Sequence, residues 1–350
     1  MNSGSNKNNR PNVVEMGGKT SYTQLNKREI LIPTRVSAEK VNVNYNFISS
    51  TIEPNDNFLI VSQSERNPLI SNNTNSFSIE YPTIDQIPLI FDSPHSGSIY
   101  PDDFGHSIDL MTLRRSEDAH VDELFSDVTM HGATLFHALF PRSYIDPNRS
   151  IDDIDITMIK GGWPHEVNPT TKTIARGVGL IWKNMKAFGP IYDRLLSQEE
   201  VVNRINQFWS PYHEALECLV KSAHDRYGKV IHINCHSMAS MGDRTTEDGE
   251  VSRPDFIVSD RDGSTCSLVI RQLVIDYLHN AGFNVAVNDP YKGCELVRRH
   301  GNPSENYHSL QIEINRSLYM DEVTLAKQPG FYRIKMVMTG LAIMLRKWLK

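Results

Sequence analysis

The sequence has no long apolar run and no concentrated positive charge, and each absence excludes a class of protein. No apolar stretch approaches the roughly 18 residues that a membrane-spanning helix needs. The N-terminal stretch MNSGSNKNNRPNVVEMGGKTSYTQ lacks the apolar segment of a secretory signal. The formal net charge is −6, without the basic stripe that follows nucleic-acid phosphates. We therefore expect neither a membrane nor a nucleic acid as a partner.

Cysteine is scarce, and its four positions are far apart, with no CxxC pair: Cys218, Cys235, Cys266 and Cys294. This spacing argues against a disulfide framework and against a thiolate zinc site. It is typical of a protein from a reducing compartment, so we expect a cytoplasmic location. Nothing in the sequence indicates the oligomeric state.

Several catalytic signatures are also missing. The sequence has no GxSxG elbow, no GxGxxG and no Walker A loop, which argues against one class of serine hydrolase and against nucleotide-dependent chemistry. The segment YHEALE departs from HExxH at its last position. A thiol nucleophile at Cys235 beside His236 is disfavoured, because adjacent residues of a strand point to opposite faces.

The composition changes along the chain. The first 75 or so residues are rich in Asn, Ser and Thr, and such a segment cannot bury enough apolar surface to offset its ordering entropy. We expect a disordered or extended tail at residues 1–80, with a short extended piece at Phe58–Val61. Residues 81–350 are predicted to form one catalytic domain.

Apolar strand-like runs alternate with amphipathic stretches from residue 87 onward. The predicted strands are Leu89–Phe91, Ala133–Phe136, Val230–Ile233, Phe256–Val258, Asn284–Val287 and Leu310–Ile314. The predicted helical stretches are Asp118–Met130, Ile191–Tyr227 (ended by Gly228, and kinked or split at Pro211), Cys266–Ala281 and Gly330–Leu349. This alternation predicts an α/β sandwich around a largely parallel sheet.

The stretch VIHINCHSMAS, residues 230–240, changes from apolar to polar within a few positions. Val230–Ile233 has the character of a buried strand, which we expect to end at Asn234. Open α/β sheets bind ligands beyond the carboxyl ends of their strands, so His236 would lie where chemistry usually takes place. A lone histidine at a strand end is more often structural, so a functional role for His236 requires partners.

Two other segments offer such partners. FDSPHSG is a second short strand followed by His95 and a turn. RRSEDAHVDELF is crowded with acidic groups, although acidic residues also suit an ordinary helix start. Asp118 follows His95 by 23 residues. A histidine, a carboxylate and a distant histidine suit a three-ligand zinc site with an open fourth position.

The segment LQIEIN, residues 310–315, predicts a strand with one apolar and one polar face. Glu313 lies on the polar face, where a carboxylate is costly without a partner or a task. It is either a general base beside a metal-bound water or a salt-bridge partner of Arg316 or Arg298.

Arg149, in SYIDPNRS, follows another strand-like run. A guanidinium binds a carboxylate in bidentate fashion, as an acidic substrate would require. The alternative is a structural ion pair with an aspartate nearby, namely Asp146, Asp152 or Asp153.

The chain resembles the N-formylglutamate amidohydrolase (N-formylglutamate deformylase) family in eight motifs that occur in order: DSPHSG, SEDAHVDELF, FPRSYIDPNR, PYH, NCHSM, RPDFIVSDRDG, NDPYKG and HSLQIEINRSLYMDE. They cover roughly residues 87–325. The resemblance implies a three-layer α/β/α sandwich with a mixed, largely parallel sheet, similar to that of zinc-dependent exopeptidases.

The same resemblance implies a metal site. His95, Asp118 and His236 match the family's metal-ligand positions for one Zn²⁺ per chain, and Glu313 matches its general base. Asp118 is preferred to the neighbouring acidic residues because the family's loop keeps an Asp two residues before its histidine.

Substrate contacts are implied as well. Asn148 and Arg149 resemble the pair that holds a substrate carboxylate in related zinc exopeptidases. If the substrate is glutamate-like, a second cation would bind its side-chain carboxylate, and the oxyanion would have an arginine, Arg142 or Arg298, nearby. The candidates for the second cation are Lys292, Arg298 and Arg176.

Two positions depart from the family pattern: Asn234 stands where Asp is frequent, and Cys294 where Gly is usual. An Asn at position 234 could orient a metal ligand only through its amide oxygen.

The implied function is zinc-dependent hydrolysis of an N-formyl (N-acyl) amino acid, such as N-formyl-L-glutamate, to formate and the free amino acid. Two alternatives are a zinc carboxypeptidase or amidase acting on peptide fragments, and a non-catalytic binding protein of the same fold. A small, doubly cationic pocket would disfavour the first, and the complete set of ligands with Glu313 disfavours the second.

Overall fold

A computed structural model describes residues 76–350, apart from residues 186–187, 245 and 247. A seven-stranded sheet in the order β1-β3-β2-β6-β9-β7-β8 runs through this part of the chain. Its strands are β1 (Phe77–Glu80), β2 (Leu89–Ser93), β3 (Thr134–Ala138), β6 (Val230–Met238), β7 (Phe256–Ser259), β8 (Val285–Val287) and β9 (Tyr307–Asn315). Strands β3, β2, β6 and β9 are parallel, whereas β1 and β7 run antiparallel to their neighbours β3 and β9. The prediction of a mixed, largely parallel sheet is confirmed.

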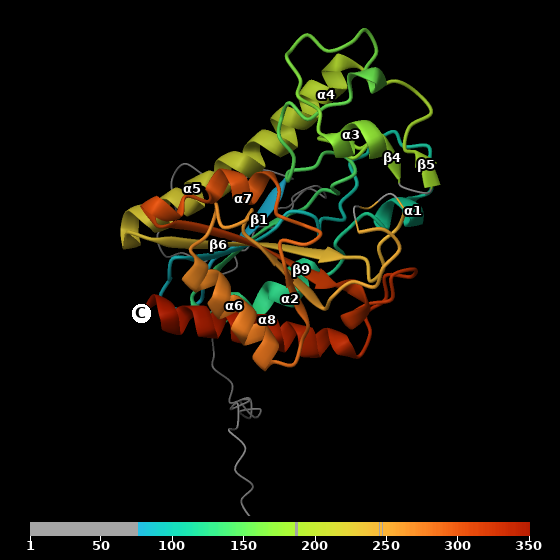
Figure 1. Ribbon diagram of the computed structural model, residues 1–350. Coiled ribbons are helices and arrows are strands. Elements are labelled where there is room, and N and C mark those ends of the chain that lie inside the picture. The colour runs from blue at the N-terminus through green and yellow to red at the C-terminus, as the bar shows by residue number, and fades with distance from the viewer. Residues whose placement is uncertain (1–75, 186–187, 245, 247) are drawn as a thin grey trace, which may run out of the picture. The chain divides into compact units, whose positions relative to one another are not determined.

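Helices cover both faces of the sheet and complete three layers (Figure 1). On one face lie α2 (Val121–Phe125), α6 (Leu268–Asn280) and α8 (Gly330–Leu349). The other face is covered by α4 (Gln198–Arg204), α5 (Ser210–Tyr227) and α7 (Glu295–His300). The remaining elements include α1 (Leu110–Arg114), α3 (Thr171–Arg176) and the two-stranded sheet of β4 (Asn184–Met185) and β5 (Gly189–Pro190).

Each face of the sheet has its own core. Along β9, Leu310, Ile312 and Ile314 pack against the layer of α6 and α8. On the opposite face, Phe136 of β3 packs against Tyr212 of α5, with their ring centroids 4.6 Å apart. The central strands are therefore buried on both sides, and a polar group on them must find a partner inside the protein.

All six predicted strands are present, but the expected end of β6 was wrong. The strand does not stop at Asn234; it continues to Met238 and pairs with β9 along its whole length. Within this half of β6, Asn234 and His236 lie opposite the polar residues Gln311 and Glu313 of β9. Strand β1 was not predicted, and its residues are the last four of the segment 1–80 that we assigned to a tail.

The helical stretch predicted at 191–227 is shorter in the structure and is divided into two helices. It begins at Gln198, after a Ser197 cap, and a π-helical turn at Ile205–Trp209 separates α4 from α5. Pro211 lies in the first turn of α5, where the missing N–H costs least. The predicted end at Gly228 is confirmed, with a positive φ of 69°.

The predicted helix at 118–130 also begins later than expected. Asp118 precedes α2, which is followed by a 3₁₀ helix at Ser126–His131. The four cysteines are all free. In the part of the chain that the structure describes, no helix is long and apolar enough to cross a membrane. The expected extended piece at 58–61 lies outside the described residues.

Candidate active site

The candidate ligands meet near the carboxyl ends of three parallel strands. His95 follows β2 by two residues, and His236 lies on β6 directly opposite Glu313 of β9. Asp118 joins them from the loop before α2, because its backbone N–H donates to the carbonyl of His95 (2.9 Å). Long-range strand pairing and this one hydrogen bond bring together residues that are far apart in the sequence.

His95, Asp118 and His236 each offer an atom to one point, and these three atoms lie within 4.8 Å of one another. Asp118 Oδ2 lies 3.0 Å from His236 Nδ1 and 3.4 Å from His95 Nδ1. All three side chains are buried. Among the acidic residues of 117–123, Asp118 is the one in this cluster, whereas Glu117 accepts hydrogen bonds from Tyr100 and Arg114.

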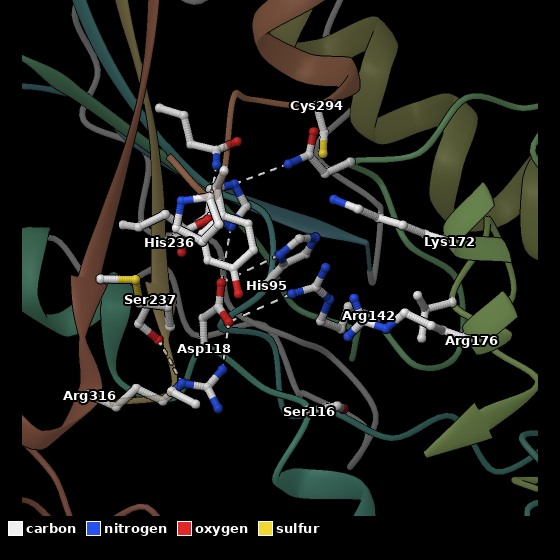
Figure 2. A pocket seen from close by; sticks show the side chains of 18 of the residues that line it. His95, Ser116, Asp118, Arg142, Lys172, Arg176, His236, Ser237, Cys294 and Arg316 are labelled. Carbon is white, nitrogen blue, oxygen red and sulfur yellow. Dashed lines mark hydrogen bonds and ion pairs between the residues drawn. The ribbon is translucent and has the colours of Figure 1, made fainter. Parts of the chain in front are cut away.

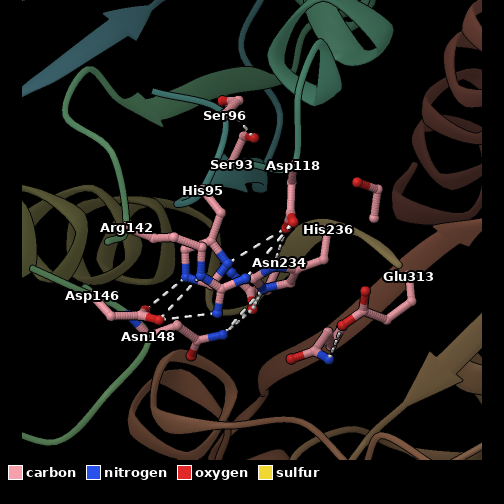
Figure 3. A network of polar contacts seen from close by, with 12 residues as sticks. Ser93, His95, Ser96, Asp118, Arg142, Asp146, Asn148, Asn234, His236 and Glu313 are labelled. Carbon is pink, nitrogen blue, oxygen red and sulfur yellow. Dashed lines mark hydrogen bonds and ion pairs between the residues drawn. The ribbon is translucent and has the colours of Figure 1, made fainter. Parts of the chain in front are cut away.

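The outer nitrogens of the two imidazoles are held by oxygen acceptors (Figure 3). His95 Nε2 donates to Asp146 Oδ1 (2.7 Å), and His236 Nε2 donates to Asn234 Oδ1 (2.6 Å). A metal-bound histidine uses its second nitrogen in this way, which fixes the ring and leaves the other lone pair for the metal. As expected from the sequence, Asn234 orients His236 through its amide oxygen.

The chemistry of these groups fits a metal ion. His95 Nδ1 is buried without a hydrogen-bond partner in the described residues, so its lone pair is available to a ligand. Burial lowers the pKa of His236 to about 4, which keeps its imidazole neutral, as a metal ligand must be. Burial opposes the charge of Asp118, yet its contacts with His236 and His95 hold its pKa well below the usual range. Two imidazoles and one carboxylate suit zinc.

Two arginines surround the carboxylate of Asp118. Arg316 Nη2 donates to Asp118 Oδ1 (2.8 Å), and Arg142 Nη1 lies 3.7 Å from the same oxygen. Arg142 also donates to Asp146 Oδ2 (2.9 Å), so it connects both acidic residues of the network. Asp118 Oδ2 is then the oxygen turned toward the two imidazoles.

Glu313 lies beside this cluster on the polar face of β9. It is 8% exposed and accepts a hydrogen bond from Gln311 Nε2 (2.9 Å). Burial and the nearby charge of Asp118 raise the pKa of Glu313 to about 8, although Arg142 and Arg316 oppose the rise. A carboxyl group with a pKa near neutrality can both accept and return a proton.

A cavity of about 410 Å³ opens in front of these residues (Figure 2). Eight cationic residues line it: Arg115, Arg142, Arg149, Lys172, Arg176, Arg253, Lys292 and Arg316. Three acidic residues line it: Asp118, Glu313 and Glu322. The excess of positive charge favours an anionic ligand.

Arg149 and Asn148, the predicted contacts for the substrate carboxylate, both line the cavity but differ in their hydrogen bonds. Arg149 lines the cavity, with Nε donating to the carbonyl of Val178 (3.1 Å) and Nη1 to that of Asn148 (3.0 Å). Asn148 also lines it, but its amide is already engaged. Its Oδ1 accepts from the N–H of Leu296 (3.0 Å), and its Nδ2 donates to Asn234 Oδ1 (3.4 Å).

The three candidates for the second cation also differ in their position relative to the cavity. Lys292 lies at the cavity wall, mostly exposed, and pairs with Asp262 (2.8 Å). Arg298 is not among the residues that line the cavity and pairs with Glu295 (2.7 Å). Arg176 lines the cavity.

Cys235 points away from this site. It is fully buried in the core beneath the sheet, where burial raises the pKa of its thiol well above the usual value. The predicted divergence of Cys235 and His236 is confirmed.

Sequence reasoning missed three residues of the site: Gln311, Asp146 and Asp92. Gln311 was visible in the alternation of β9, two residues before Glu313 and on the same face. Asp146 had been considered only as an ion-pair partner of Arg149. Asp92 accepts from the amide of Asn234 (2.9 Å), a contact across two strands that no local pattern indicates.

Comparisons with known proteins identify the family. The sequence model of the N-formylglutamate amidohydrolase family matches residues 87–320. The N-formylglutamate deformylase of Pseudomonas putida is 26% identical over 252 residues, which cover 71% of this chain and 86% of that protein. The N-formylglutamate deformylase of Pseudomonas aeruginosa is 24% identical over 241 residues, covering 68% of this chain and 84% of that protein.

Solved structures give the same result. The crystal structure of N-formylglutamate amidohydrolase from Ralstonia eutropha JMP134 is similar with a TM-score of 0.75 and 43% sequence identity, covering 79% of this chain and 98% of that one. A gene product from Agrobacterium tumefaciens, 17% identical with a TM-score of 0.56, shares the fold. Since the family match spans more than half of the sequence, this chain belongs to the N-formylglutamate amidohydrolase family.

Proposed function

We propose that this protein is a zinc-dependent amidohydrolase that cleaves N-formyl-L-glutamate to formate and L-glutamate. The observation that carries the proposal is the buried cluster of His95, Asp118 and His236 beside Glu313, in a cavity with an excess of cations. Family membership supports the substrate class, because the relatives named above are N-formylglutamate deformylases.

His95 and His236 would hold the zinc ion through Nδ1, and Asp118 through Oδ2. Bound there, zinc would lower the pKa of water toward ~7 and polarise the formyl carbonyl. Asp146 and Asn234 keep the two imidazoles in the ligand orientation through their Nε2 atoms.

Glu313 is the proposed general base. Its carboxylate takes a proton from the attacking water and then returns it to the leaving nitrogen of the substrate. Gln311 holds the carboxylate through its Nε2, while Gln311 Oε1 is buried without a partner in the described part of the chain and can accept the substrate's amide N–H. Arg142, beside Asp118, lies where its charge can stabilise the negative oxygen of the transition state.

Arg149 is the proposed contact for the substrate's α-carboxylate. Its guanidinium is fixed by two carbonyls, so little side-chain freedom is lost on binding. Asn148 has its amide engaged by the N–H of Leu296 and by Asn234 Oδ1, which makes it a positioning residue in this proposal.

The experiment compares the purified protein with Glu313→Gln, Arg149→Met and His236→Ala. The wild type should contain about one divalent metal per chain and release formate from N-formyl-L-glutamate. Glu313→Gln should keep the metal and lose about 10²- to 10⁴-fold in kcat. Arg149→Met should weaken substrate capture, seen mainly as a higher KM, and His236→Ala should lose most of the metal.

Substrate choice decides between this proposal and the alternatives. Cleavage of short peptides in preference to N-formyl amino acids would favour a peptidase. A chain that binds no metal and turns over none of these substrates would favour a binding protein. Normal kcat in Glu313→Gln would show that another group is the base.

A further inference from the structure

Three buried polar atoms at the cavity wall have no hydrogen-bond partner in the described residues: His95 Nδ1, Gln311 Oε1 and Arg176 Nε. Buried polar atoms in proteins are nearly always paired, so each unpaired one needs an explanation. The proposed metal and the substrate's N–H account for the first two. Arg176 Nε is a donor that still lacks an acceptor.

Arg176 is held at a defined place in the cavity. It is the last residue of α3, and Gly177 ends the helix with φ of +68°, where a Cβ would lie 2.5 Å from the amide of Asn184. Asp153 anchors the start of α3 by accepting from the N–H of Thr170 (2.7 Å) and the hydroxyl of Thr173 (2.5 Å). The guanidinium therefore projects from a short helix that is fixed at both ends.

Positive charge is concentrated at this wall. Lys172 precedes Arg176 by four residues on α3, and both side chains line the cavity (Figure 2). Like charges at this helical spacing repel each other, which favours an anion between or in front of them. Arg142 extends into the same part of the cavity, but it is committed to Asp146 and Asp118.

We infer that Arg176, with Lys172 beside it, binds the side-chain carboxylate of the substrate and is the residue that selects an acidic N-acyl amino acid. This inference rests on the proposed function and extends it. The other candidates for this contact are worse placed, because Lys292 pairs with Asp262 and Arg298 pairs with Glu295 away from the cavity lining.

The buried carboxylate of Asp153 lies close to both Arg149, the proposed contact for the α-carboxylate, and α3, which carries Arg176. Asp153, which anchors α3, also lies 3.9 Å from Arg149 Nε. Asp153 thus contacts Arg149 directly and is connected to Arg176 only through α3, whose first turn it anchors. Two cations at a fixed separation discriminate substrates by length as well as by charge, since a shorter diacid cannot reach both.

The test measures kcat/KM with N-formyl-L-glutamate and with N-formyl-L-glutamine, which has the same length without the negative charge. In Arg176→Met, the value for the glutamate substrate should fall about 10- to 100-fold, the scale of one lost charge-assisted contact. The value for the glutamine substrate should change less than about threefold. Arg176→Lys should recover part of the loss.

The control is Arg333→Met, which removes an exposed arginine of α8 that lies over the ring of Phe283 and does not line the cavity. It should change neither value. Equal losses on both substrates in Arg176→Met would overturn the inference. So would an Arg298→Met variant that loses the preference for the charged substrate while Arg176→Met keeps it.

Calorimetry with the amino acids L-glutamate and L-glutamine separates this inference from the proposed function. The wild type should bind L-glutamate more tightly, and Arg176→Met should lose that difference. If the wild type hydrolyses neither substrate but shows this binding pattern, the proposed reaction fails and the assignment of Arg176 stands. If it hydrolyses N-formyl-L-glutamate while Arg176→Met keeps the binding preference, the reaction stands and the assignment fails.

Discussion

At the scale of single residues, Asn234 decides how His236 is presented. Its Nδ2 donates to Asp92 Oδ2 (2.9 Å), and because a buried carboxylate can only accept, this contact fixes the orientation of the amide. The amide oxygen then lies 2.6 Å from His236 Nε2, which must carry the proton. The lone pair of His236 Nδ1 is left for the metal, so Asp92 acts on the site through two other residues.

Asn234→Leu should therefore lower metal affinity without removing a ligand. Leucine has a similar volume but cannot accept from His236, so the imidazole loses its orientation. Loss of such an outer contact typically costs 10- to 100-fold in metal affinity. Competition with a chromogenic chelator measures the effect, and His236→Ala provides the limit for loss of the ligand itself. Unchanged affinity in Asn234→Leu would mean that packing alone holds the imidazole.

The pKa of Glu313 predicts a pH effect on stability. An acid whose pKa rises on folding, here from an ordinary 4.5 to about 8, binds its proton more tightly in the folded state. Its stabilising contribution is complete below pH 4.5 and is lost as the pH rises through about 8. Chelator-treated wild type and Glu313→Gln should melt at similar temperatures near pH 5, and the variant should melt increasingly higher as the pH approaches 9. Parallel melting curves across this range would contradict the buried, protonated carboxyl.

At the scale of elements, α4 and the π-helical turn that follows it each carry one group that supports the site. Arg204, immediately before the turn, is 1% exposed and lies 4.1 Å from the ring centroid of Tyr144. It donates to the carbonyls of Tyr144 (3.0 Å) and Phe104 (3.3 Å). Trp209, the last residue of the turn, donates to the carbonyl of Arg149 (3.0 Å). The helix pair thus holds the segment that contains both Asp146 and Arg149.

Arg204→Met should destabilise the protein by about 2–4 kcal/mol, because two buried carbonyls lose their donor and the aromatic rings lose the guanidinium. Thermal unfolding of the metal-loaded protein measures the loss. Arg194→Met is the matched control, since it removes an arginine of the same region whose ion pair with Glu200 is partly exposed, and such pairs contribute little. Equal stability of the two variants would show that the buried arginine is not a structural anchor.

At the scale of the whole molecule, the core on one face of the sheet includes side chains of β1. Phe77 and Ile79 of β1 are each 3% exposed, and the strand pairs with β3 from Phe77 to Glu80. The ring of Phe77 lies 5.2 Å from that of Phe136, centroid to centroid. We propose that the catalytic domain folds by itself and that its boundary precedes Phe77.

Truncation tests this boundary. A chain of residues 76–350 should keep its melting temperature and turnover, since the composition of the first 75 residues cannot contribute much packed core. A chain of residues 81–350 lacks β1 and should lose about 3–6 kcal/mol, the burial energy of one phenylalanine and one isoleucine. A large loss already in the longer chain would place stabilising contacts before residue 76.

Local patterns in the sequence were sufficient for the type and order of most elements. The alternation at 310–315 predicted both the strand and the polar face that carries Glu313, because successive side chains of a strand point to opposite faces of the sheet. Gly228 predicted the end of α5 because few residues adopt a positive φ easily. The length of β6 could not be predicted in the same way, since its polar half is kept in the sheet by its partner β9.

The sequence by itself determined the α/β class, the strands that carry His236 and Glu313, and a short list of ligands and cations, since these follow from local periodicity, motif order and residue chemistry. Only the tertiary structure decided which members of that list act together. It joined Asp118 to His95 through a backbone hydrogen bond, engaged the amide of Asn148 and paired Arg298 with Glu295. It also left Arg176 Nε in the cavity without a hydrogen-bond partner among the residues that the structure describes. Each of these outcomes depends on contacts between residues distant in the sequence or on the direction of a side chain, which a linear pattern does not encode.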